Sequence, residues 1–148
     1  MTLSNLTMCR LVNFGLIASL VFVVSGCDRV APQVAAKAFV PATDVTRPMV
    51  GKWGIDGEAT LILELEGNQV VISAPENDTW RMDVLDAKIV GDEIHFTQKN
   101  YLHDGSSHPF NGVACNSIVK LLDDDSMEFG MTTVLTPDYD ADVMVRME

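Results

Sequence analysis

Apolar and polar residues alternate with a period of two along most of the chain that follows Met49. In one such stretch, Trp80, Met82 and Val84 alternate with polar neighbours. Strict alternation is typical of strands that bury one face, and turn residues recur between the alternating stretches. The sequence therefore predicts an all-β domain. We expect about eight strands, at residues 50–56, 59–66, 69–75, 79–89, 93–99, 113–122, 126–134 and 141–148.

The connections between these expected strands are mostly short, which favours antiparallel hairpins between neighbours. A single antiparallel up-and-down meander of about eight strands removes its free edges by closing into a small β-barrel, so we predict this architecture for residues 49–148. A β-sandwich is the alternative. The one long connection, Asn100–Asn111, is a candidate functional loop. In the last strand, we expect Val143, Val145 and Met147 to face inward.

The first 26 residues form a different kind of segment. Arg10 is followed by a mainly apolar run from Leu11 to Ser25. That run is shorter than the roughly 20 residues that a membrane-spanning helix requires. It has the length of the apolar part of an export signal, so residues 1–26 are predicted to be a cleaved signal peptide.

The residues Val24-Ser25-Gly26-Cys27 at the end of this run resemble the lipobox of bacterial lipoproteins. The resemblance implies that Cys27 becomes the first residue of the mature protein and carries acyl chains such as palmitate, which anchor it stably in the lipid bilayer. Asp28 resembles the inner-membrane retention signal of enteric-type lipoproteins. We therefore expect a lipid-anchored protein that faces the periplasm. Residues 27–48, rich in Pro and Ala, are predicted to be the lipidated Cys and a flexible tether.

The Gly51-Lys52-Trp53 tripeptide resembles the Gly-x-Trp start of lipocalin-like barrels. The resemblance implies a β-barrel in which Trp53 closes one end. We expect Trp53 to be buried, as is usual for an aromatic side chain of this size in a small domain.

Charge restricts the classes of partner. Arg10 is the only charged residue of the first 26, so the remaining chain has 9 basic and 21 acidic residues and a net charge of −12. Phosphate binding requires clustered Lys and Arg, so nucleic acid is not an expected partner. Cys9 leaves with the signal and Cys27 is the expected lipidation site. Cys115 then has no intramolecular partner, and we expect it to be buried and inert.

A small barrel is either filled by its own side chains or holds one small ligand. Six of the eight methionines lie in residues 49–148, and methionine suits both a core and an adaptable apolar pocket. The residues expected to line such a pocket are Leu63, Met82, Phe96, Phe129 and Met131.

His103, Asp104 and His108 lie together in the long loop and are a candidate interaction site. Their spacing, also with His95, matches no standard zinc pattern, and the acidic stretch from Asp138 lacks the glycine and glutamate of a calcium loop. The nearby serines form no recognisable catalytic arrangement. We therefore predict no metal, no cofactor and no enzymatic activity.

These observations lead to two expected functions. The first is a membrane-anchored lipoprotein that binds a small apolar ligand in a lipocalin-like barrel. The alternative is a protein-interaction module of the cell envelope, such as an inhibitor, an adaptor or an assembly factor, which binds through the 100–111 loop or an exposed strand edge.

Overall fold

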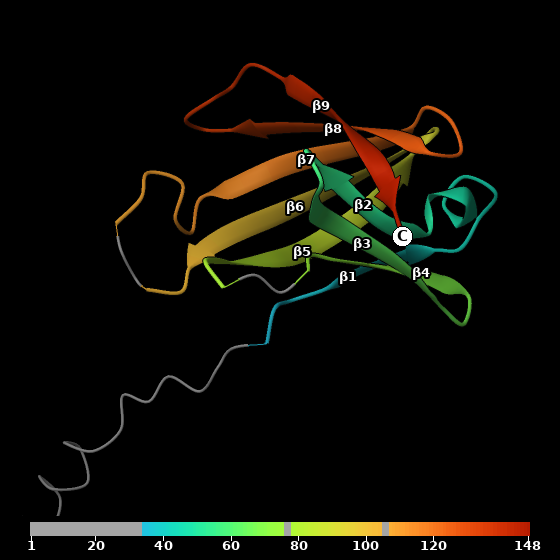
Figure 1. The fold of residues 1–148 in the computed structure, drawn as a ribbon, viewed down its shortest axis with the longest axis horizontal. Coiled ribbons are helices and arrows are strands. Elements are labelled where there is room, and N and C mark those ends of the chain that lie inside the picture. Colours follow the sequence, from blue (N-terminus) through green and yellow to red (C-terminus); the bar gives the residue numbers. More distant parts are fainter. Residues whose placement is uncertain (1–33, 76–77, 105–106) are drawn as a thin grey trace, which may run out of the picture. The chain divides into compact units, whose positions relative to one another are not determined.

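The computed structural model describes residues 34–75, 78–104 and 107–148, and the compact unit runs from Ala35 to Glu148 (Figure 1). This unit is all-β, as predicted. Its elements are β1 (Ala38–Pro41), the short 3₁₀ helix η1 (Arg47–Met49), β2 (Gly51–Ile55), β3 (Glu58–Glu66), β4 (Gln69–Ser73), β5 (Trp80–Val90), β6 (Glu93–Leu102), β7 (Ala114–Leu121), β8 (Ser126–Thr133) and β9 (Asp140–Met147). No helix among the described residues is long and apolar enough to cross a bilayer.

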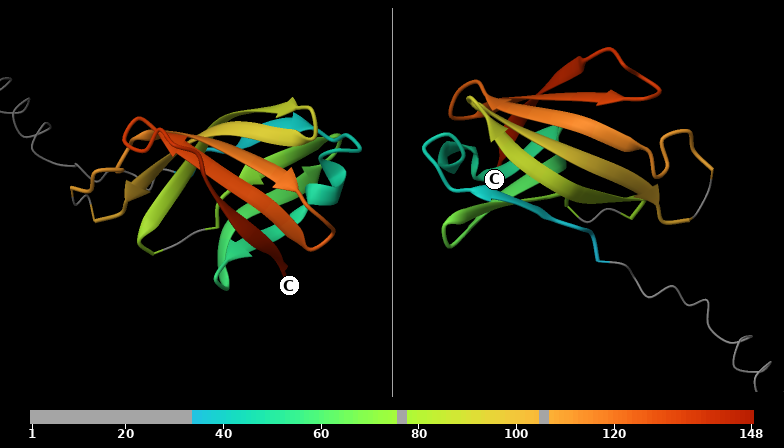
Figure 2. Two further views of the ribbon diagram at one scale, coloured as in Figure 1. Left: turned by 90° about the horizontal axis from the view of Figure 1, so that it is seen from above. Right: turned by 180° about the vertical axis from the view of Figure 1, so that it is seen from behind.

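The strands form one sheet with the order β1-β4-β3-β2-β9-β8-β7-β6-β5, and every ladder between neighbours is antiparallel. The sheet curls on itself into a nearly closed barrel (Figure 2). Each of the eight predicted strands is present within a few residues of its expected bounds. A single sheet is present where the alternative, a sandwich, requires two sheets.

The barrel closes where the first strand meets β5. The backbone N–H of Val84 donates to the carbonyl of Ala36 at 2.9 Å, just before β1. The Asp83 carboxylate also accepts a hydrogen bond from the N–H of Ala36, at 3.0 Å. With nine strands and eight antiparallel ladders, β1 and β5 must run in the same direction. An antiparallel ladder therefore cannot complete the ring at this seam.

One sequence-based expectation was wrong at this seam. Residues 27–48 were predicted to be a tether, but Ala38 and Val40 are buried in the barrel, and Thr46 before η1 is fully buried. The predicted antiparallel meander of about eight strands is present, and β1 is an additional strand that lies between β4 and β5. The N-terminal strand covers edges that β4 and β5 would otherwise leave open.

Inward-facing residues of all the strands form the core. The fully buried side chains of largest volume are Trp53, Met49, Leu61, Leu63, Ile72, Ile94, Met127, Met144, Val40, Val70, Val71 and Val84. The burial of Trp53 confirms the expectation drawn from the Gly-x-Trp tripeptide. The core lies inside the barrel, as expected for a small barrel filled largely by its own side chains.

Two strands depart from simple alternation. A β-bulge between Val84 and Asp86 leaves Leu85 and Asp86 both exposed, and it reverses which residues of β5 face inward. In β9, Met144 is the buried residue, while Val143 and Val145 are half exposed. The predicted inward face of β9 was therefore wrong, because the apolar run 143–145 fits either phase of an alternating pattern.

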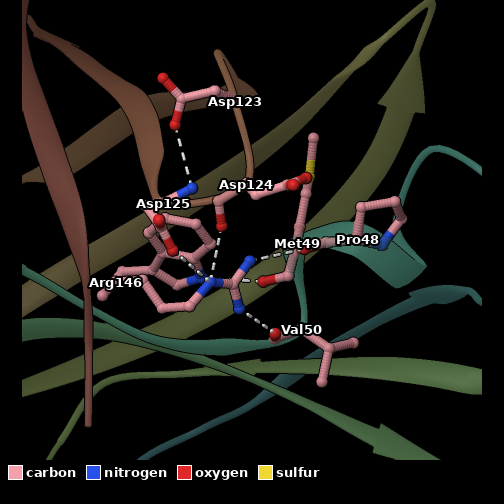
Figure 3. A network of polar contacts seen from close by, with 8 residues as sticks. Pro48, Met49, Val50, Asp123, Asp124, Asp125 and Arg146 are labelled. Carbon is pink, nitrogen blue, oxygen red and sulfur yellow. Dashed lines mark hydrogen bonds and ion pairs between the residues drawn. The ribbon is translucent and has the colours of Figure 1, made fainter.

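One end of the barrel is closed by a network around Arg146 (Figure 3). Its guanidinium donates to the carbonyls of Val50 (2.6 Å), Pro48 (2.9 Å) and Asp124 (2.8 Å). The same group lies 4.3 Å from the centroid of the Trp53 ring. Arg146 thus joins η1, β2 and the β7–β8 turn.

Candidate functional site: a cavity toward the other end of the barrel

A cavity of about 400 Å³ lies toward the opposite end from the Arg146 network. The β6–β7 connection and the end of β4 contribute to it, whereas the Arg146 network includes the β7–β8 turn at the other end of β7. The cavity is lined by Ala59, Thr60, Leu61, Ala74, Pro75, Trp80, Met82, Gln98, Asn100, His108, Phe110, Phe129 and Met131. The lining is mainly apolar and aromatic with a few polar groups, which is the usual composition of small-molecule sites.

Three rings form the rim. The Trp80 and His108 rings are perpendicular, with centroids 5.3 Å apart, and the His108 and Phe110 centroids are 5.8 Å apart. His108 Nδ1 also accepts a hydrogen bond from the N–H of Phe110 at 3.2 Å. These contacts hold the second half of the β6–β7 loop against the start of β5.

The same loop is fastened to the end of β6. The N–H of Leu102 donates to Asn111 Oδ1 at 3.1 Å, and the N–H of Gly112 donates to the carbonyl of Asn100 at 2.7 Å. Gly112 has a φ of 72°, a conformation that glycine adopts without strain. The rim is therefore tied to the barrel by the backbone as well as by ring contacts.

The inner wall carries one buried amide, Gln98, which is only 3% exposed. Its Nε2 donates to Met131 Sδ at 3.7 Å, but its Oε1 is buried and has no hydrogen-bond partner. Ser117 Oγ, on the neighbouring strand β7, is also buried without a partner. Buried polar atoms are rarely left unsatisfied, so both atoms are unusual, but Gln98 lines this cavity and Ser117 does not.

The structure separates the predicted pocket residues into two groups. Met82, Phe129 and Met131 line the cavity, and each is only partly buried. Leu63 and Phe96 lie deeper, in the packed core.

The three predicted loop residues are also separated. His108 is at the rim of the cavity, while His103 and Asp104 are exposed and are not among the lining residues. Cys27 and Asp28 lie outside the described residues.

Sequence reasoning missed Trp80, Gln98 and Phe110 as cavity residues. The signal for Gln98 was present, because it continues the inward-facing series of Ile94 and Phe96 along β6. Phe110 gave no such signal, because it belongs to a loop with no periodic pattern. Its position depends on the ring contacts with His108.

Other reactive groups are placed apart from the cavity. Among the described residues, no group of three or more His, Cys, Asp or Glu side chains is placed to share a metal ion. His95 pairs with Glu93 at 2.7 Å on the outer surface. Cys115 is buried, and burial raises the pKa of its thiol. A raised thiol pKa leaves little of the nucleophilic thiolate at neutral pH.

A second hollow of about 420 Å³ lies on the outer face of β5–β8. Tyr139, from the β8–β9 connection, forms one side of it and donates a hydrogen bond to Glu128 Oε1 at 3.3 Å. Burial and the nearby Glu128 carboxylate raise the pKa of Tyr139. Tyr139 packs on the bare backbone of Gly130, where a Cβ atom would overlap the phenol ring.

Comparisons of the chain with protein-family models, with curated proteins and with solved structures gave no match.

Proposed function

We propose that this protein is a membrane-anchored lipoprotein of the bacterial envelope that binds a small apolar ligand in the barrel cavity and does not transform it. The cavity itself carries the proposal. Its volume of about 400 Å³ falls within the range of roughly 300–1,000 Å³ that is usual for small-molecule sites. The unbranched side chains of Met82 and Met131 adapt to ligands of different shape.

The anchor follows from the resemblance of Val24–Cys27 to a lipobox, with Asp28 favouring retention at the inner membrane. Because β1 belongs to the barrel, the chain between Cys27 and the barrel is shorter than a tether of residues 27–48. The compact unit begins at Ala35, which is eight Cα–Cα steps along the chain from Cys27. Fully extended, they reach at most about 29 Å. The domain would therefore take up its ligand close to the membrane, where apolar molecules are concentrated.

Native mass spectrometry tests ligand binding directly. The chain from Asp28, exported into a bacterial envelope behind a non-lipoprotein signal, contains the whole compact unit. We expect a stoichiometric mass excess that disappears on denaturation. A Met131→Trp variant, which fills the cavity, should be isolated without that mass. A wild-type protein isolated at its bare mass from several growth conditions would contradict the proposal.

A second candidate function, protein interaction, is favoured by one observation on β9. This strand pairs with β8 over Asp140–Val145 but with β2 only over Val145–Met147. In the described part of the chain, no strand pairs with the other side of residues 140–143, which are all exposed. Asp138, Asp140 and Asp142 make this edge acidic. An extended segment with alternating Lys or Arg residues would complement the edge as an added strand.

Two synthetic peptides distinguish this function from ordinary protection of a strand edge by charge. An alternating Lys-Val hexapeptide should shift the amide resonances of residues 140–143, and an alternating Glu-Val hexapeptide should not. Changing both Asp140 and Asp142 to Lys should reverse the preference. Equal responses to both peptides would show that the acidic residues only keep the edge from pairing.

A further inference from the structure

Gln98 occupies a position on β6 where its neighbours on the same face are apolar. Ile94 and Phe96 precede it on that face, and both are buried. In the unfolded chain, both polar atoms of the amide are hydrated, so burial costs free energy unless each atom finds a partner. An apolar residue at this position would avoid that cost, which makes the amide a feature that needs an explanation.

The hydrogen bond to Met131 gives only the nitrogen of the amide a partner. Nε2 donates one of its two hydrogens to Met131 Sδ at 3.7 Å. The oxygen, an acceptor, has no partner. Gln98 also lines the cavity. The residue whose oxygen lacks a partner therefore belongs to the wall of the candidate ligand site, and the oxygen itself is covered.

We propose that the ligand of this cavity carries an uncharged hydrogen-bond donor, a hydroxyl or an amide N–H, which binds Gln98 Oε1, and that its body is apolar. This inference rests on the proposed ligand-binding function and specifies the class of ligand. The apolar body lies against Phe129, Met82 and Met131 and beneath the Trp80 ring at the rim.

The chemistry of the wall favours a neutral donor over an ion. A carboxylate brought to Gln98 would meet the negative end of the amide dipole. An ammonium group would bring three donors and a full charge to one acceptor among thioether and aromatic side chains, and burying an unpaired charge is far more costly than burying a hydroxyl. None of the described lining residues is an Asp, Glu, Lys or Arg.

The acceptor is covered in the structure, so neighbouring atoms must move before a ligand reaches it. Met131 is suited to this movement, because its unbranched thioether has several rotatable bonds. The gain is a hydrogen bond from a hydroxyl or amide donor to Gln98 Oε1, which removes the unsatisfied acceptor. The cost is the weaker contact of Nε2 with the sulfur of Met131.

Three probes with one ring system test this inference on the chain from Asp28, which keeps the whole compact unit. 2-Naphthol offers a hydroxyl donor, 2-methoxynaphthalene has the oxygen without the donor, and 2-naphthoate carries a carboxylate. Binding is measured at pH 7 by calorimetry and by the change in Trp80 fluorescence in a Trp53→Phe background. We expect naphthol to bind about tenfold more tightly than methoxynaphthalene, and naphthoate to bind more weakly than both.

In Gln98→Met, the acceptor is replaced by an apolar side chain of similar length, and the tenfold preference should disappear while methoxynaphthalene binds as before. Ser117→Ala is the matched control. It removes the other unpartnered polar atom, which does not line this cavity, and it should leave the preference unchanged.

The outcomes separate the two proposals. Equal binding of naphthol and methoxynaphthalene to the wild-type protein overturns the inference about the donor and leaves ligand binding standing. A preference that persists in Gln98→Met also overturns it. If none of the three probes binds, the cavity function itself is contradicted together with the ligand class. The wild-type comparison alone decides the question if the Gln98 variant does not fold.

Discussion

The guanidinium of Arg146 lies over the indole ring of Trp53 at 4.3 Å, and the two residues are directly opposite each other in the β2–β9 ladder. Two further bonds from the same guanidinium reach the carbonyls of Pro48 and Val50. One side chain from the last strand therefore holds η1 and β2, nearly a hundred residues earlier in the chain. The planar guanidinium suits this role, because it donates in several fixed directions while its face covers a ring.

Changing Arg146 to Met should lower the free energy of unfolding by about 2–4 kcal/mol, because the carbonyls of the closed end lose a charged donor and Trp53 loses its cover. The loss for Arg146→Lys should lie between zero and the loss for Arg146→Met, because lysine keeps the positive charge but lacks the planar group that donates in several fixed directions. Urea unfolding followed by Trp fluorescence measures both. Arg47→Met is the control. Its exposed guanidinium makes only a long contact of 3.5 Å with Asn68, so we expect a change within about 0.5 kcal/mol. Equal losses for Arg47 and Arg146 would refute the assigned role.

Gly130 should control the ionisation of Tyr139. A methyl group at Gly130 overlaps the Tyr139 ring, so Gly130→Ala should displace the ring into solvent at a small cost in stability. Burial and the Glu128 carboxylate raise the pKa of Tyr139 in the folded protein, because both disfavour the charged phenolate. Displacement removes both effects, and the pKa should therefore fall in Gly130→Ala.

Absorbance titration of phenolate measures this shift, with the Tyr139→Phe variant subtracted to isolate the signal of Tyr139. Glu128→Gln is the second variant. It leaves the ring in place and removes only the negative charge, so it should lower the pKa of Tyr139 by less than Gly130→Ala does. An unchanged titration curve in Gly130→Ala would show that the ring already ionises as an exposed phenol.

Period-two alternation predicted the strands β2–β9 because each has enough residues to show the pattern. It missed β1 for a physical reason. That strand has four residues, of which only Ala38 and Val40 are buried, and it ends in Pro41. Two inward positions are too few to reveal a period, and a proline argues locally against a strand. The strand forms because it fills the gap between the edges of β4 and β5, and the local sequence of residues 38–41 carries no signal of that tertiary pairing.

A chain that begins at Met49 should therefore fail to form a stable monomer. It lacks the strand that covers the edges of β4 and β5, and it lacks the buried side chains of Val40 and Thr46. Exposed strand edges favour aggregation. Size-exclusion chromatography and thermal unfolding should show a cooperative monomer for the chain from Asp28 and aggregates for the chain from Met49. Two equally stable monomers would mean that β1 is dispensable.

The cavity was only partly predictable from the sequence. Met82, Phe129 and Met131 were found because they continue the alternation of their strands. Gln98 lies in the same phase of β6, but a polar residue in an inward position is not counted by a search for apolar periodicity. In β9 the run 143–145 fits both phases, and only the pairing of Met144 with Met127 fixes which residue faces inward. Where a run of apolar residues fits both phases, only the pairing with the neighbouring strand determines which residues face inward.

The lipid anchor is tested at Cys27. In cells supplied with an alkyne-bearing palmitate analogue, the wild-type protein should be labelled and should sediment with membranes. Cys27→Ser should remove the label and leave the precursor uncleaved, because the acyl chains attach through the thiol and processing depends on that step. Cys115→Ser is the matched control, since Cys115 is buried in the barrel and its loss should leave labelling unchanged. Membrane association of the wild-type protein without label, or a label that persists in Cys27→Ser, would contradict anchoring at Cys27.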